Sequence, residues 1–380
     1  MDFDLSEAQR KRYEEVLAGV RGQVPAGPAG VPRLPFSRPE WSDAARLGMM
    51  GLCLPVEYGG GGLGALDTAL CLEAFTEGGA DTGRAFAVGA HLLACAVPVR
   101  DFGAGPMRGE LLAGMANGRL IAANAMTEDG AGSDIGTLGT AVTRDGEEYV
   151  LNGVKSFVSN APAADVFVIY GTSDPDAGFL GQTSLAVPRR LPGLTVGEPF
   201  AKMGLQACPA ARVEFSDCRV PVRCRLGHEG QGSAIFQHSM SWERSCLLAI
   251  YLGQMRRQLD GCVAHAKQRR QFGRPIGSFQ AVSHRIAAMT QRLESARLLL
   301  YRACWLLDQG RADTAATAMS KLAVSEATIA NSLDAIQIFG GPGYLTDTGI
   351  EAQLRDSVPS VIFSGTTDIQ REIIVNRAGL

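Results

Sequence analysis

Glu243 and Arg244, at the start of a long apolar run, are the residues of this chain best suited to acid–base chemistry. Helical spacing places Glu243 on an apolar face. The other residues of that face are Phe236, Met240, Leu247 and Ile250. Burial there would raise the pKa of the carboxyl group towards the range useful to a general base. The alternative is a solvated ion pair, the usual fate of such neighbours. We predict that Glu243 is the base and that Arg244 orders the structure around it.

Three other titratable residues are weaker candidates for catalysis. Glu128 and Asp134 belong to a short glycine-containing loop, where we expect them to hold the loop by hydrogen bonds. His91 lies in an apolar stretch, where a hydrogen-bonded core histidine is the commoner outcome. The five histidines show no metal-ligand spacing, and the nine cysteines form no CxxC pair. We therefore predict no metal site, and reduced, packed thiols.

Length and composition predict a globular protein of two or three domains. The chain has 380 residues, 46% hydrophobic and 20% charged, with a net charge of −3. This balance gives no argument for nucleic acid or a membrane as partner. No run reaches the roughly 18 apolar residues of a membrane span. The first residues, Met1 to Ser6, lack a basic-then-apolar signal, so we expect a cytoplasmic protein.

The periodicity of apolar residues predicts an α+β fold with three domains. They are an N-terminal helical domain (1–118), a middle β-domain (119–228) and a C-terminal four-helix bundle (229–380). In the first, we expect helices over 41–54, 66–75 and 84–97. The segment from Gly22 to Pro39 is too rich in glycine and proline for a helix, and we expect a surface loop there.

The β-domain is predicted to be a small barrel-like or two-sheet unit. Short strands are expected over 165–170, 183–187 and 211–215. Asn152-Gly153, between Tyr149-Val150-Leu151 and Val154 to Val158, predicts a hairpin turn, because Asn-Gly favours positive φ angles.

Two apolar stripes predict core seams of the bundle. The first comprises Val282, Ile286, Met289, Leu293, Ala296 and Leu300. The second comprises Met319, Leu322, Ile329, Leu333, Ile336 and Phe339.

Four motifs resemble hallmarks of the acyl-CoA dehydrogenase family. They are Met-Thr-Glu-Asp-Gly-Ala-Gly-Ser-Asp (126–134), Arg-Arg-Gln-Phe-Gly-Arg-Pro-Ile (269–276), Gln-Ile-Phe-Gly-Gly-Pro-Gly (337–343) and Phe-Ser-Gly-Thr (363–366). They occur in the family's order, and the similarity covers essentially the whole chain. The resemblance implies FAD as cofactor, a homotetramer and α,β-dehydrogenation of acyl thioesters.

The resemblance also implies roles for individual residues. The expected cofactor-binding residues are Met126, Thr127, Gly132, Ser133, Phe157, Ser159, Arg269, Phe272, Gln280, Gln337, Gly340, Gly341, Thr366 and Asp368. Those from Arg269 to Gly341 resemble positions that reach the FAD of a neighbouring subunit. Phe157 and Ser159 stand where the family usually has Trp and Thr, and Asp368 departs from the common choice. Ser133, Arg244 and Ser364 are the expected substrate-binding residues.

The position of Ser364 often holds the family's catalytic glutamate, and serine cannot serve as that base. One branch of the family instead carries its base on a bundle helix, just before an arginine. Glu243 matches that position. The resemblance thus supports Glu243 as the residue that removes the substrate α-proton.

Several stretches, including 64–69, 121–125, 159–165 and 297–305, resemble a narrower group. Its members oxidise an L-prolyl group held as a thioester on a peptidyl carrier protein, towards dehydroprolyl or pyrrolyl-2-carboxyl products. This is the expected function, with a carrier protein as partner. The alternatives are an acyl-CoA dehydrogenase for branched or amino-acid-derived CoA esters, and a non-catalytic FAD-binding module of the same fold.

Overall fold

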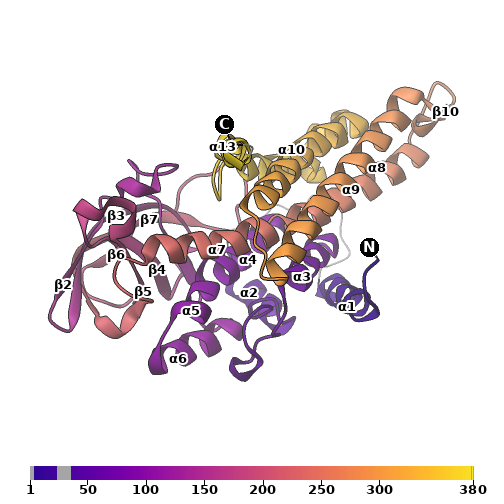
Figure 1. Ribbon diagram of the computed structural model, residues 1–380. Helices are drawn as coiled ribbons and strands as arrows, with labels where there is room; N and C mark the ends of the chain where they lie inside the picture. The colour runs from indigo at the N-terminus through magenta and orange to yellow at the C-terminus, as the bar shows by residue number, and fades with distance from the viewer. Residues whose placement is uncertain (1–3, 24–35, 378, 380) are drawn as a thin grey trace.

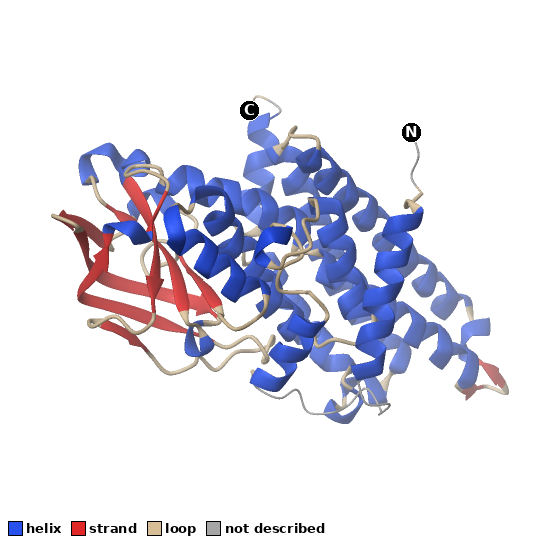
Figure 2. Cartoon of the chain, turned by 90° about the horizontal axis from the view of Figure 1, so that it is seen from below, coloured by secondary structure: helices blue, strands red, loops and turns tan. Residues whose placement is uncertain are grey.

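The computed structural model describes residues 4–23, 36–377 and 379. A β-sheet forms one end of the molecule, and helices from both halves of the chain pack together to form the rest (Figure 1; Figure 2). The expected α+β class is confirmed. The boundaries expected at residues 118 and 228 stay predictions.

The N-terminal region is helical. Its helices are α1 (Glu7–Gln23), α2 (Arg38–Arg46), η1 (Val56–Tyr58), α3 (Ala65–Glu77), α4 (Thr82–Gly89), η2 (Ala90–Ala96), α5 (Val97–Phe102) and α6 (Gly105–Ala116). The helix expected to reach Leu54 ends at Arg46, because Gly48 takes a left-handed conformation (φ 75°). Of the loop expected over 22–39, residues 24–35 lie outside the described residues, and its two ends belong to α1 and α2.

Helices α4, η2 and α5 run on as one helical stretch, Thr82–Phe102, whose middle is a π-helix. By length and mean hydropathy this stretch is long and apolar enough to cross a membrane, a feature that a search for an unbroken apolar run does not detect. Within the protein, however, 83% of its apolar window is buried, as in a core helix of a globular protein. The π-helix was not predicted, and π-helical turns frequently occur at functional sites.

The middle region is one eight-stranded sheet. Its strands are β1 (Ala122–Ala125), β2 (Ala141–Asp145), β3 (Glu148–Ser159), β4 (Val166–Thr172), β5 (Gln182–Pro188), β6 (Leu194–Val196), β7 (Ala210–Pro221) and β8 (Arg225–Leu226). The order is β6-β7-β3-β2-β4-β5-β8, with β1 parallel to β4. Side chains from six of these strands share one buried cluster, so the sheet curls around a core of its own.

The hairpin predicted at Asn152-Gly153 is wrong. Both residues lie inside the continuous strand β3, which pairs with β7 and shifts register there. The observed hairpin lies earlier in the chain, where the turn at Gly146 (φ 61°) joins β2 to β3. Gly153 serves close packing instead, because a Cβ at this position would lie 2.7 Å from the Thr140 backbone.

The C-terminal region is a helical bundle with a small β-hairpin at its tip. The helices are α7 (Gly232–Cys246), α8 (Ala249–Gln268), α9 (Gln280–Asp308), α10 (Thr314–Phe339), α11 (Gly341–Tyr344), α12 (Ile350–Ser357) and α13 (Thr367–Arg377). The hairpin consists of β9 (Arg270–Gln271) and β10 (Arg274–Pro275) and lies at the opposite end of the molecule from the large sheet (Figure 1).

The two predicted core stripes differ in outcome. On α9, Met289, Leu293 and Leu300 are fully buried, as expected. On α10 the prediction is wrong for most of the stripe: no member is fully buried and Leu333 is exposed, although Ile336 and Phe339 pack against the core while partly buried. The inner face of α10 is built from small residues, which let the helices approach closely. Among these buried residues are Ala315, Ala318, Ser325, Ala327, Ser332 and Ala335.

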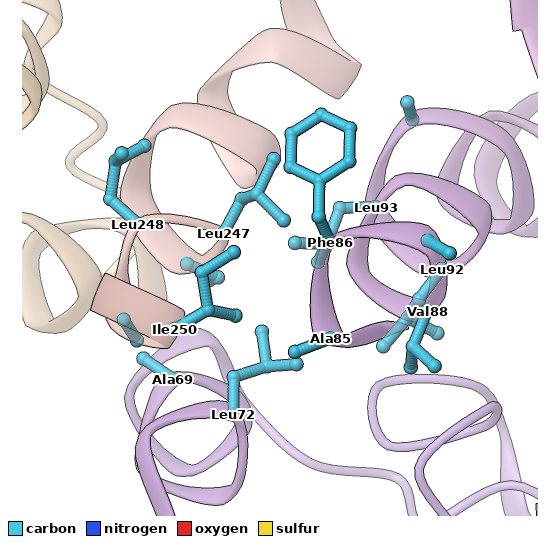
Figure 3. Close-up of a cluster of buried hydrophobic side chains, with 14 of the residues drawn as sticks. Ala69, Leu72, Ala85, Phe86, Val88, Leu92, Leu93, Leu247, Leu248 and Ile250 are labelled. Carbon is cyan, nitrogen blue, oxygen red and sulfur yellow. The ribbon is translucent and has the colours of Figure 1, made fainter. Parts of the chain in front are cut away.

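The main core joins the two helical regions. Leu247 and Ile250, at the junction of α7 and α8, point into the space between α3 and the α4–η2 stretch, and Leu248 belongs to the same buried cluster (Figure 3). This junction follows Glu243 directly in the chain. The main apolar core therefore holds the end of α7 in place.

Candidate active site

Glu243 lies on the buried face of α7, as the spacing predicted. Its exposed fraction is 7%, and Phe236, Met240 and Leu247 on the same face are also buried. The helix ends at Cys246, so Ile250 belongs to α8 but is equally buried. The solvated-pair alternative is therefore excluded for Glu243.

The loop between α12 and α13 closes over this carboxyl group. The Ser364 hydroxyl donates a hydrogen bond to Glu243 Oε1. Arg244 Nε donates to the Ser364 carbonyl oxygen at 2.8 Å, so neighbouring residues of α7 hold both the side chain and the backbone of Ser364. Ser364 has a φ of 54°, which is strained for a residue with a side chain.

Burial raises the pKa of Glu243 above its ordinary value. The Ser364 hydrogen bond and the positive charge of Arg244 oppose this rise, because both favour the ionised carboxylate. A carboxylate balanced in this way is suited to accepting and releasing a proton.

A second group of predicted residues lies where the loop 126–134 meets β3. The backbone N–H of Ser156 donates to the Thr127 carbonyl oxygen at 2.8 Å. Lys155, fully buried on β3, donates from Nζ to the Met126 carbonyl oxygen (3.0 Å) and to Glu128 (2.8 Å). The structure thus brings Met126 and Thr127 close to the strand that carries Phe157.

Glu128 and His91 have the structural roles expected for them. Glu128 accepts hydrogen bonds from the backbone of Gly139 (2.7 Å) and Thr140 (2.9 Å), which fixes the loop. His91 Nδ1 accepts from the backbone of Ala122 at 3.0 Å, and Nε2 lies 3.3 Å from the Met115 carbonyl oxygen. Burial lowers the pKa of His91 to about 4, so it is a neutral core histidine.

Phe157 forms an exposed aromatic surface beside this loop. Its side chain is 62% exposed although it stands in a strand, and its φ of 55° is strained for so large a residue. Phe200 lies against it, with ring centroids 5.4 Å apart. Strain and exposure of an aromatic ring at one position indicate a ligand-binding surface, and such a surface fits a planar isoalloxazine ring.

The predicted cofactor residues from Arg269 to Gly341 gather at the opposite end of the molecule from the large sheet, on the bundle tip. An open cleft of about 570 Å³ lies there, between the β9–β10 hairpin and helices α9 and α10. Phe272 and Gln337 line it, and Gln337 also accepts a hydrogen bond from Arg285. Phe272 is 93% exposed with a φ of 50°. Within one chain this tip, marked by β10, lies away from helix α7, which carries Glu243 (Figure 1).

Several predicted residues have less defined settings. Gly132 and Ser133 are exposed on the loop, and Ser159 ends β3. Thr366 Oγ1 accepts from the Ile369 backbone at 3.3 Å, in the first turn of α13. Asp368 points to solvent and pairs with Arg371 at 3.0 Å. Their roles in binding stay predictions.

Sequence reasoning missed two buried residues of this region, Lys155 and Tyr170. A lysine in the middle of a predicted strand was a usable signal, because an unpaired buried ammonium group is costly and requires partners. Tyr170 gave no such signal, since an aromatic residue at the end of an apolar strand is common.

Family models for the acyl-CoA dehydrogenase N-terminal, middle and C-terminal domains match residues 6–119, 123–218 and 230–379. The chain is 48% identical to an L-prolyl-[peptidyl-carrier protein] dehydrogenase from Pseudomonas fluorescens, over the full length of both. It is 44% identical to a protein of the same name from Serratia, covering 100% of this chain and 99% of that one. The solved structure "PigA with FAD and proline" superposes with a TM-score of 0.94 at 42% identity, over the whole of both chains. The chain therefore belongs to the acyl-CoA dehydrogenase family.

Proposed function

We propose that this protein is an FAD-dependent dehydrogenase that oxidises an L-prolyl thioester carried by a peptidyl carrier protein. The observation that carries this proposal is the buried Glu243 carboxyl group under Ser364, in a chain similar along its full length to prolyl-carrier dehydrogenases. The product is a dehydroprolyl thioester or, after a second oxidation, a pyrrolyl-2-carboxyl thioester.

Glu243 removes the α-proton of the prolyl group. The apolar face of α7 excludes water from the carboxylate, which makes it a stronger base than a solvated glutamate. The Ser364 hydrogen bond orients the carboxylate, and Arg244 holds Ser364 in place. When bound, FAD supplies the acceptor for the hydride that leaves the adjacent ring carbon.

The residues fit FAD at two separate places. Phe157 offers an aromatic face for the isoalloxazine ring, between β3 and the loop of Met126 and Thr127. The cleft of Phe272 and Gln337 fits the far end of the cofactor bound to a neighbouring subunit. This division requires an oligomer, and we propose a homotetramer. The exposed apolar residues Leu298 and Trp305 on α9 and Leu333 on α10 provide surface for it.

We propose that the enzyme is cytoplasmic. Its substrate is the prolyl group bound to the carrier protein, not free proline. We propose that the enzyme supplies pyrrole or dihydropyrrole units to a natural product such as an antibiotic. The carrier delivers its phosphopantetheine thioester to Glu243.

The test mixes the FAD-loaded protein anaerobically with L-prolyl carrier protein, and separately with a panel of acyl-CoA esters, while flavin absorbance is followed. Bleaching by the prolyl carrier is the expected result. Bleaching by acyl-CoA alone would overturn the carrier substrate and favour an acyl-CoA dehydrogenase. If neither substrate bleaches the flavin, the chain is a non-catalytic FAD-binding module. Product mass then distinguishes two-electron from four-electron oxidation.

A further inference from the structure

One face of the large sheet carries buried polar atoms that have no well-formed hydrogen bond among the described residues. They are Tyr170 Oη on β4, Ser184 Oγ on β5 and Asn124 Oδ1 on β1. Tyr170 and Ser184 are directly opposite one another across the β4–β5 pair. Asn124 is opposite Val168, two residues before Tyr170. Residues two apart in a strand share a face, so all three side chains lie on the same side of the sheet.

This polar face is turned towards Glu243. The Tyr170 ring packs edge-on against Phe236 of α7, with centroids 5.5 Å apart. Burial raises the pKa of Tyr170, and the negative charge of Glu243 adds to the rise. The nearby Ser239 and Ser184 hydroxyls moderate it, although neither forms a hydrogen bond of good geometry with the phenol. The phenol is therefore neutral and lies within electrostatic reach of the carboxylate.

Unpaired polar atoms in such a place point to a polar ligand. A buried hydroxyl or amide oxygen costs free energy unless a ligand or an ordered water completes its hydrogen bonds. Tyr170 and Ser184 are both fully buried, and Phe236 of α7, which packs against Tyr170, is apolar. The hydrocarbon part of an ordinary acyl chain has no group to offer them. A substrate with an N–H group can donate a hydrogen bond to these buried oxygens.

Building on the proposed function, we infer that Tyr170, Ser184 and Asn124 form a subsite for the ring nitrogen of the prolyl group. This nitrogen is bonded directly to the carbon that loses its proton to Glu243, so its binding groups must lie beside the base. The phenol and amide oxygens accept hydrogen bonds from the two N–H groups that the ring nitrogen carries when it is protonated. The subsite selects a cyclic amino acyl group over a hydrocarbon ring of the same shape, because a buried polar site rejects an analogue that leaves it unpaired.

The experiment compares two substrates on the same carrier protein: the L-prolyl group and the cyclopentanecarbonyl group, which lacks the nitrogen. Anaerobic flavin reduction is measured for the wild type and for Tyr170→Phe. We expect Tyr170→Phe to slow reduction by the prolyl substrate about 10- to 100-fold. Reduction by the carbocyclic substrate should change less than about threefold, so the preference for prolyl collapses.

Tyr149→Phe is the matched control. The Tyr149 hydroxyl is already paired, donating to Glu229 at 2.6 Å, so its removal should leave the substrate preference unchanged. Asn124→Ala is a second arm that removes the amide from the same face. If Tyr170→Phe fails to retain FAD, the substrate preference of Asn124→Ala tests the subsite instead.

The possible failures are distinguishable. If the wild type is reduced by the prolyl carrier but both variants keep its preference, the subsite is wrong and the proposed function stands. An equal loss on both substrates would make Tyr170 a structural residue and also overturn the subsite. If the wild type responds to acyl-CoA and not to prolyl carrier, the proposed function fails together with this inference.

Discussion

Two regions of the molecule carry predicted site residues, the surroundings of Glu243 and the bundle tip, and they differ in how far one chain encloses those residues. Around Glu243, the carboxyl group is buried, hydrogen-bonded by Ser364 and enclosed by helices of the same chain. At the bundle tip, Phe272 is 93% exposed and lines an open cleft. The difference fits the proposal above, in which a single chain supplies the proton-transfer residues and the tip becomes a binding site only against a second copy of the chain.

The largest expected effect is that of a substitution at Glu243, in the enclosed region. Glu243→Gln keeps the shape of the side chain but cannot accept a proton, so flavin reduction by substrate should fall at least 10²- to 10⁴-fold. The protein should stay folded and yellow. Stopped-flow absorbance gives the rate, and Glu243→Asp, which retains a carboxylate, should recover part of it. A near wild-type rate in Glu243→Gln would remove Glu243 from the mechanism.

Substitutions at the bundle tip should affect cofactor binding and assembly rather than proton transfer. Phe272→Ser and Gln337→Ala should weaken FAD retention about 10- to 100-fold and shift the protein towards smaller assemblies. With FAD in excess, the pH dependence of the reaction should match the wild type, because Glu243 is untouched. Ultracentrifugation and cofactor titration measure these effects. If the variants kept both FAD and assembly, the cleft would have no part in the site.

Lys155→Met should act through the loop 126–134. It removes the ammonium group that joins the Met126 carbonyl and Glu128, and it leaves the Glu128 carboxylate partly buried beside an apolar side chain. Breaking a buried pair costs about 3–5 kcal/mol, less where water reaches one partner. We expect a lower melting temperature and roughly tenfold weaker FAD binding. The double variant Lys155→Met, Glu128→Gln should recover stability, and purely additive losses would contradict this coupling.

Ser364→Ala should have the smallest effect, a rate loss below about tenfold. The Ser364 hydrogen bond lowers the pKa of Glu243, so its removal raises that pKa. Glu243 works in its deprotonated form, and the acidic limb of the kcat/KM profile should therefore move to higher pH. A pH–rate profile measures the shift. A loss beyond about a hundredfold, roughly 2.7 kcal/mol, would show that Ser364 takes part in the chemistry directly.

Sequence reasoning succeeded where a short-range pattern decides the structure. The burial of Glu243 followed from the spacing of its apolar neighbours, since one helical face packs against the core. It failed on α10, because small residues pack inward there and leave Leu333 outside. It also failed at Gly153, where packing against Thr140, and not a turn, demands glycine.

The remaining features depend on contacts between distant parts of the chain. Lys155 reaches Glu128 across 27 residues, and Ser364 reaches Glu243 across 121. No local periodicity encodes such pairs. The resemblance of the motifs supplied the position of Ser364, but the unpaired face of Tyr170 and Ser184 became visible only with the sheet register.

The strained backbones of Phe157, Phe272 and Ser364 have a consequence for protein engineering. A positive φ costs any residue with a Cβ, and replacement by glycine at such a position relieves that cost. A screen for heat resistance would therefore favour glycine at these three positions. The same substitutions would remove the rings and the hydroxyl assigned to the site, so the variants selected for heat resistance would be the least useful as catalysts.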